Sequence, residues 1–146
     1  MVQKQDPAAE ASPIRSAVDA FNLGDLDGYL GHFAPSCRRW VAGFENPLSL
    51  LEVGANMRQL VAAFEPLRLD ELLLMTQNDF VCARWQLRGT QVADYLGIPS
   101  RGSDIDVSIC EICEITDGGV SEVWTYQDPG QMFRQMALGR TAEGNQ

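Results

Sequence analysis

Basic residues and histidines are scarce in this 146-residue sequence. It has 11 lysines and arginines against 20 aspartates and glutamates, a formal net charge of -9, and one histidine. Nucleic-acid binding needs a clustered basic surface, and only Arg38 and Arg39 are adjacent here. The sequence therefore predicts no nucleic-acid partner. A conventional zinc site would find few ligands, so no metal is expected.

Long hydrophobic runs are also lacking. No segment approaches the roughly 20 apolar residues that span a bilayer, so no membrane partner is expected. The first twelve residues are polar and lack the apolar core of a signal peptide, from which we expect a cytoplasmic protein. The chain is 45% hydrophobic and 21% charged, which is typical of globular proteins. Its length predicts one domain.

Several motifs of cofactor and hydrolase chemistry are absent as well. The sequence has no Gly-rich phosphate loop, no G-x-S-x-G elbow and no H-E-x-x-H zinc helix. These absences favour cofactor-free chemistry or plain binding, and no cofactor is expected.

Cys110 and Cys113 have the C-x-x-C spacing of redox and zinc motifs. Their flanking residues are typical of a strand, however, and residues three apart in a strand point to opposite faces. We therefore interpret this match as accidental.

The pattern of apolar residues predicts helices in the first half and strands in the second. Ser12-Pro13, Asp25 and Asn46-Pro47 are expected to open three helices. A short strand should lie between the second and third helices. The remaining strands should then follow in succession, and the predicted strand ranges are 37–43, 67–75, 80–88, 104–116 and 120–127.

A tight hairpin turn is expected at Asp117-Gly118-Gly119, and a last helix should begin at Pro129 behind its cap Asp128. Helices followed by an antiparallel meander indicate an α+β domain. We place this domain at residues 13–139, with flexible ends at residues 1–12 and 140–146.

The predicted strand 104–116 carries the most informative residue. One of its faces holds Ile105, Val107, Ile109, Cys113 and Ile115 and is apolar except for Glu111. A carboxylate among such neighbours is paired with a buried arginine, raised in pKa, or poised for proton transfer. Arg39, on the first predicted strand, could be that partner or could orient a carbonyl oxygen.

Large aromatic residues are the other candidates. Trp40, Trp85 and Trp124 either belong to the core or form a flat wall for an aromatic ligand. Together with Ile109 on the apolar face and Tyr126 at the end of the last strand, they are the predicted substrate-binding residues.

Four segments of the chain resemble one known family. Tyr95-Leu96-Gly97-Ile98-Pro99, Thr116-Asp117-Gly118-Gly119-Val120, Glu122-Val123-Trp124 and Phe133-Arg134-Gln135 are similar to SnoaL-like polyketide cyclases of the NTF2-like superfamily. The resemblance implies a cone of curved antiparallel sheet closed by N-terminal helices. It also implies a hydrophobic pocket, a small hydrophobic or aromatic substrate, cofactor-free acid/base chemistry and a homodimer.

The resemblance also implies which residues would be catalytic. In the ring-closing cyclases an aspartate on the last long strand is the general acid/base, and Thr125 stands at that position. A histidine of the preceding strand falls at Glu111, and an asparagine of the first strand falls near Arg39. Threonine cannot transfer protons as aspartate does. The proton-transfer role could therefore have moved to Glu111, or the chain could belong to the related proteins that are linked to hydroxylation rather than cyclisation.

Three functions remain open from the sequence. The first is cyclisation or isomerisation of a polycyclic carbonyl compound in aromatic polyketide or related natural-product biosynthesis. Glu111 would remove a proton beside the carbonyl, while Arg39, Thr125 or Tyr126 held the oxyanion. The second is a hydroxylase-type protein of the same pathways with a reductase partner, and the third is a non-catalytic binding module.

Overall fold

The computed structural model describes residues 7–139. The elements follow one another as α1 (Pro7–Asn22), α2 (Leu26–Leu30), β1 (Phe33–Val41), β2 (Leu48–Ser49), α3 (Leu50–Ala63), β3 (Phe64–Gln77), β4 (Phe80–Gln91), β5 (Asp104–Thr116), β6 (Gly119–Tyr126) and α4 (Pro129–Leu138). The expected flexible tail and the first six residues of the expected lead-in lie outside this range.

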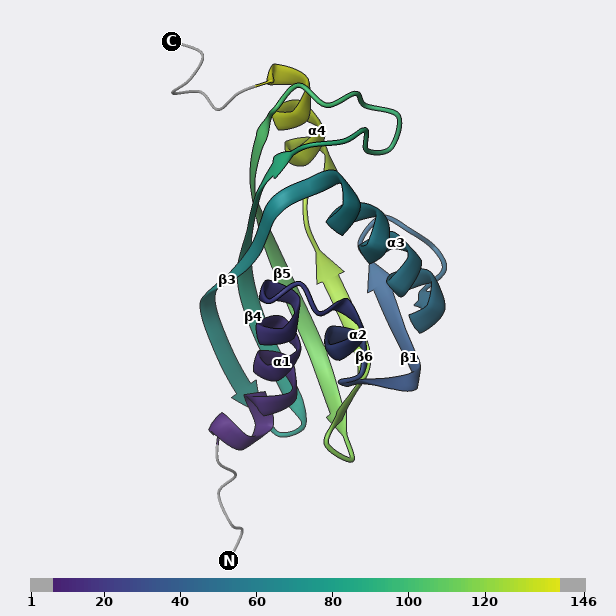
Figure 1. Cartoon of the computed structure of the whole chain (residues 1–146). Coiled ribbons are helices and arrows are strands. Elements are labelled where there is room, and N and C mark those ends of the chain that lie inside the picture. The colour runs from purple at the N-terminus through teal and green to yellow at the C-terminus, as the bar shows by residue number, and fades with distance from the viewer. Residues whose placement is uncertain (1–6, 140–146) are drawn as a thin grey trace, which may run out of the picture.

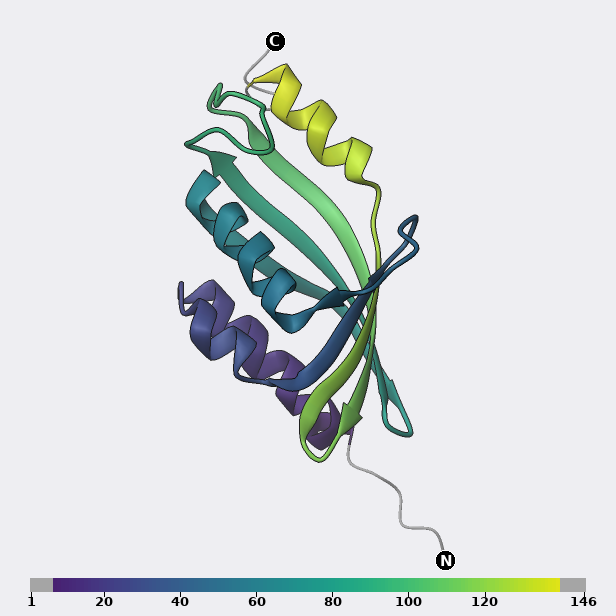
Figure 2. The same ribbon diagram turned by 90° about the vertical axis from the view of Figure 1, so that its right-hand side faces the viewer.

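The strands form one sheet in the order β2-β1-β6-β5-β4-β3. Strand β1 pairs parallel with β6, and every other neighbouring pair is antiparallel. The sheet is strongly curved, and α1, α2 and α3 lie against its concave side (Figure 1 and Figure 2). The predicted α+β class, with a curved sheet closed by helices, is confirmed. No helix within residues 7–139 is long and apolar enough to cross a membrane.

Strict alternation along the central strands divides the sheet into two faces. On β5, Ile105, Val107, Cys113 and Ile115 are buried on the concave face, whereas Asp106 and the other residues between them are exposed or half-buried. Strand β4 alternates in the same way, with its concave-face residues in the core: Val81, Ala83, Trp85 and Leu87. Period-two alternation thus produces a concave apolar core.

The two cysteines of the C-x-x-C match lie on opposite faces of β5. Cys113 is buried on the concave face, and Cys110 is half-buried on the convex face. Both thiols are free, and residues 7–139 contain no cluster of three metal-ligating side chains. The prediction that these two cysteines point to opposite faces of a strand is confirmed.

Two helix starts differ from those predicted. Helix α1 begins at Pro7 and contains Pro13, because the alanine-rich residues around Glu10 favour a helix upstream of it. Helix α3 begins at Leu50 rather than at Asn46-Pro47. Ser49 caps it, and Ser49 and Glu52 hydrogen-bond each other's backbone N–H groups in a capping box.

The caps predicted at Asp25 and Asp128 are present. Each carboxylate accepts a hydrogen bond from a backbone N–H in the first turn of α2 or α4. The hairpin between β5 and β6 turns at Asp117 and Gly118, both with positive φ, as a two-residue type I′ turn requires.

Helix α4 contacts the part of β5 that extends beyond the end of β6. The last partner of β5 on β6 is Tyr126, opposite Cys110, so the first half of β5 lacks a strand on that side. The Gln135 side chain accepts from Asp106 N and donates to Asp106 O, replacing the missing strand with a helix.

Candidate functional site

Four polar side chains meet on the concave face of the sheet. Glu111 lies on β5 and Thr125 lies directly opposite it on β6. Arg39 comes from β1, beyond β6, and Tyr29 comes from α2. The other members of the cross-strand row through Glu111 are apolar, namely Leu74, Ala83 and Val41. The cluster is therefore a polar island in an apolar surface.

One oxygen of Glu111 receives both contacts to the carboxylate. Thr125 Oγ1 donates to Glu111 Oε2 at 3.1 Å. Arg39 Nη2 lies 3.7 Å from the same oxygen and donates to the Tyr29 hydroxyl at 3.0 Å. Nitrogen Nη2 thus sits between the carboxylate and the phenol.

The burial of the pair is deep but incomplete. The side chains of Arg39 and Glu111 retain 15% and 17% of their exposure. Arg39 Nε is buried and has no partner within residues 7–139. Neither Glu111 Oε1 nor Arg39 Nη1 accepts or donates a hydrogen bond within that range, and neither is sealed from solvent. These two atoms, one acceptor and one donor, thus keep unused hydrogen-bonding capacity within residues 7–139.

The protonation states follow from this packing. Burial raises the pKa of Tyr29, with the cation of Arg39 opposing and Glu111 reinforcing the shift, so the phenol keeps its proton. Burial alone would lower the pKa of Arg39, but Tyr29 and Glu111 outweigh it and raise it. The site therefore holds a neutral phenol beside a fixed positive charge.

The predicted catalytic residues Glu111, Arg39 and Thr125 all belong to this cluster. The structure brings them together through the pairing of β6 with both β5 and β1. Of the alternatives open from the sequence, the ion pair between Arg39 and Glu111 is present. Tyr29 was not predicted as a site residue. The sequence did contain a signal, since Tyr29 lies on the apolar stripe of the predicted second helix. A phenol buried there usually needs a hydrogen-bond partner, which points to a polar neighbour.

The predicted substrate-binding residues divide between the two faces. Trp85 is buried on the concave face, and Ile109 is half-buried there. Trp40, Trp124 and Tyr126 instead lie on the convex face.

The convex positions follow from alternation. Trp124 and Tyr126 flank the concave-face Thr125, and Trp40 follows Arg39 on β1 and pairs with Trp124. Trp40 Nε1 donates to Glu122 there. The expectation that these three residues share a pocket with Glu111 is therefore wrong, because neighbouring residues of a strand face opposite sides.

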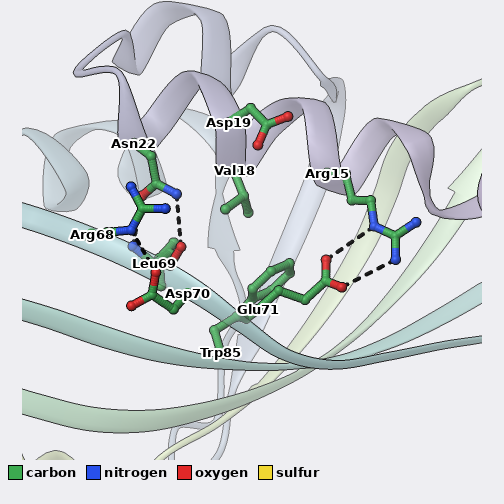
Figure 3. A pocket seen from close by; sticks show the side chains of 9 residues that line it. All are labelled: Arg15, Val18, Asp19, Asn22, Arg68, Leu69, Asp70, Glu71 and Trp85. Atoms are coloured by element: carbon green, nitrogen blue, oxygen red, sulfur yellow. Dashed lines mark hydrogen bonds and ion pairs between the residues drawn. The ribbon is translucent and has the colours of Figure 1, made fainter.

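A cavity of about 210 Å³ lies between α1 and β3, away from Glu111. Its lining is mostly polar (Figure 3): Arg15, Val18, Asp19, Asn22, Arg68, Leu69, Asp70, Glu71 and Trp85. The ion pair of Arg15 with Glu71 spans its side, and Asn22 exchanges two hydrogen bonds with the Leu69 backbone. The hydrophobic pocket that the resemblance implies is not this cavity, because the lining is mostly polar.

Several solved structures share the fold of this chain. AclR from Streptomyces galilaeus, described as "a putative hydroxylase", matches at a TM-score of 0.83 with 22% identity over 91% of this chain and 98% of its own. IdmH from Streptomyces antibioticus, "a putative polyketide cyclase", matches at 0.76 with 23% identity over 88% and 98%. TerC, co-crystallised with polyporic acid, matches at 0.70 with 14% identity over 88% and 98%.

No curated protein matches the sequence. The family model of the SnoaL-like polyketide cyclases matches residues 13–136, which is most of the chain. This protein therefore belongs to the SnoaL-like polyketide cyclase family.

Proposed function

We propose that this protein is a cofactor-free acid/base enzyme of aromatic polyketide or related natural-product biosynthesis, which cyclises or isomerises a polycyclic carbonyl compound. The observation that carries the proposal is that the two carboxylate oxygens of Glu111 have different contacts. Its Oε2 is held by Thr125 and Arg39, whereas its Oε1 is open. A base needs one free oxygen within reach of the substrate and a fixed orientation, and this carboxylate has both.

The chemistry requires only groups that the chain supplies. Glu111 Oε1 takes a proton from the carbon beside the carbonyl, and the electron pair of the broken C–H bond forms an enolate. Arg39 Nη1 donates to the enolate oxygen. In an isomerisation, Glu111 returns the proton to a different carbon. In a cyclisation, the enolate carbon bonds to a second carbonyl carbon, and the resulting alkoxide takes the proton from Glu111.

The environment and the family support this substrate class. Glu111 is surrounded by the apolar concave face, on which Trp85 and Ile109 lie along the same strands β4 and β5. IdmH is described as "a putative polyketide cyclase", and TerC was crystallised with polyporic acid, an aromatic compound. A flat, hydrophobic, oxygen-bearing ligand fits both.

Deuterium exchange tests the proposal without knowledge of the natural substrate. The protein is incubated in D₂O with 2-tetralone, an aromatic ketone with acidic C–H bonds, and exchange is followed by ¹H NMR. Base catalysis typically contributes about a hundred- to ten-thousand-fold, so Glu111→Gln should remove most of the enzymatic exchange. The matched control is Glu114→Gln, on the same strand but on its convex face.

Equal exchange by wild type and Glu111→Gln would contradict the assignment of the base. Polyporic acid provides an independent readout, since it should bind wild type and Glu111→Gln with similar affinity by calorimetry.

A hydroxylase-type role is the second candidate, and the described role of AclR supports it. It is favoured here by Thr125, which stands where ring-closing relatives are expected to carry an acidic residue. Product formation that depends on oxygen and on an added reductase would favour this role. Binding of aromatic compounds without turnover under either condition would favour a binding module.

The homodimer is proposed through the convex face of the sheet. A row of apolar residues crosses five strands there in direct register, namely Met75, Cys82, Ile112, Trp124 and Trp40. Leu73, Phe80 and Tyr126 beside it are exposed. A second copy packing on the same row across a two-fold axis would cover it. Sedimentation should show a dimer that Met75→Glu dissociates and that Val61→Glu, on exposed α3, leaves intact.

A further inference from the structure

Tyr29 holds its hydroxyl group in a fixed place. Its ring is buried and packs against Phe21 and Phe33, with centroid distances of 5.7 and 5.0 Å. Helix α2, which carries it, is capped by Asp25 and packs against α1 and α3. Packing on both sides therefore leaves the phenol little freedom of rotation.

The Tyr29 hydroxyl restrains the one guanidinium nitrogen that faces the carboxylate. Arg39 Nη2 donates to it at 3.0 Å and lies 3.7 Å from Glu111 Oε2, which is too long for a hydrogen bond. Within residues 7–139, the contact to Tyr29 is thus the hydrogen bond that orients the guanidinium.

The unpaired Nε of Arg39 indicates what this orientation favours. A buried donor without a partner is costly, and Arg39 Nε is such a donor within residues 7–139. Within residues 7–139, the observed orientation leaves Nε unpaired and Nη1 without a hydrogen bond, and Nη1 is not sealed from solvent. Such local cost is typical of groups held ready for a ligand.

We propose that Tyr29 is a positioning residue of this site, whose hydroxyl fixes Arg39 Nη2 beside Glu111 so that Nη1 is presented to an oxygen atom of the substrate. This role rests on the proposed function, in which Arg39 stabilises the enolate oxygen. Helix α2 thus contributes a positioning residue to a site whose other polar residues lie on strands of the sheet.

The test is Tyr29→Phe, which keeps the ring and removes the hydroxyl. The matched control is Tyr95→Phe, whose half-buried ring packs against Phe64 at 5.4 Å. The first readout needs no substrate. In ¹H–¹⁵N spectra the buried Arg39 Nε–H should give a slowly exchanging signal, identified by its loss in Arg39→Lys. Tyr29→Phe should accelerate its exchange with solvent at least tenfold, and Tyr95→Phe should not.

The second readout is deuterium exchange into 2-tetralone. Loss of a hydrogen bond to a charged group corresponds to roughly a tenfold or greater loss of rate. We expect Tyr29→Phe to lower kcat by this factor with little change in KM, because it disturbs the oxyanion contact. A structural defect would instead reduce the amount of folded protein and leave kcat per folded molecule unchanged.

A Tyr29→Phe protein with a protected Arg39 signal and wild-type kcat would overturn the proposal. If Tyr29→Phe fails to fold, the proposal is tested on the wild type. Fast rotation of the Arg39 Nη2 amino group in low-temperature NMR spectra of the wild type would also overturn the proposal. Failure of the proposed function is distinguishable. It would appear as wild-type inactivity, or as activity in Glu111→Gln, while the Arg39 signal reports on Tyr29 alone.

Discussion

Thr125 Oγ1 donates a hydrogen bond of 3.1 Å to Glu111 Oε2 from the directly opposed position on the neighbouring strand. In the relatives that close rings, the resemblance places an acid at this position, and here the residue is a donor. A hydroxyl cannot accept a substrate proton in place of a carboxylate, but it can orient the carboxylate that we propose as the base. Thr125 and Glu111 are thus joined by a hydrogen bond across two strands.

Replacing Thr125 by valine should test this pairing through stability. Valine nearly preserves the shape but removes the donor, and hydrogen bonds to charged groups contribute about 1.5–3 kcal/mol. We expect Thr125→Val to lower the free energy of unfolding in urea by about that amount and Thr125→Ser to restore most of it. The control is Thr116→Val, which removes an exposed hydrogen bond to the Ser121 hydroxyl and should cost far less. Equal losses at both positions would contradict the prediction.

Removing Arg39 alone should lower the free energy of unfolding more than removing both Arg39 and Glu111. Breaking a buried pair leaves one uncompensated charge, and Arg39→Met should therefore destabilise the fold by about 3 kcal/mol. In Arg39→Met/Glu111→Leu no charge remains, so most of this loss should be recovered. Urea unfolding of wild type, both single variants and the double variant gives the coupling energy. Strictly additive losses would show that the two residues do not interact.

Alkaline pH should destabilise the protein through Cys37. Burial raises the pKa of this thiol from 9.0 to about 11, with Arg39 opposing and Glu122 reinforcing the shift. Well below pH 9 both states keep the proton. Between pH 9 and 11 the unfolded chain loses it first and binds fewer protons, so stability falls as pH rises, by about 2 kcal/mol at pH 10.5.

Urea unfolding under reducing conditions at several pH values measures this slope. Cys37→Ala should flatten it without abolishing it, because burial also raises the pKa of Cys113. An unchanged slope in Cys37→Ala would exclude this thiol as the cause.

The local sequence correctly predicted the strands and helix caps that depend mainly on neighbouring residues. The strand 104–116 was predicted with its observed bounds, since period-two alternation of apolar residues is a strong signal. The caps Asp25 and Asp128 were also predicted correctly. The start of α3 was predicted wrongly because Asn46-Pro47 is a common helix opening, while the Ser49–Glu52 capping box and the pairing of Ser49 with Arg38 set the actual start.

The wrong predictions at the site could have been avoided from the local sequence alone. Trp124 and Tyr126 were grouped with Thr125, although adjacent residues of a strand cannot share a face. The same rule separates Trp40 from Arg39. Alternation along β6 and β1 was enough to exclude these three side chains from the concave face. In contrast, the grouping of Arg39 with Glu111 could only be stated as one of several readings.

By itself the sequence determined that Glu111 projects into an apolar surface, because alternation along one strand depends only on neighbouring residues. Only the tertiary structure decided what meets that carboxylate. The parallel pairing of β1 with β6 brings Arg39 within 3.7 Å of it, and the packing of α2 on the sheet places the Tyr29 hydroxyl against Arg39. Such contacts join residues 10 to 72 positions apart, and their geometry depends on how the whole sheet curves and closes rather than on any local pattern.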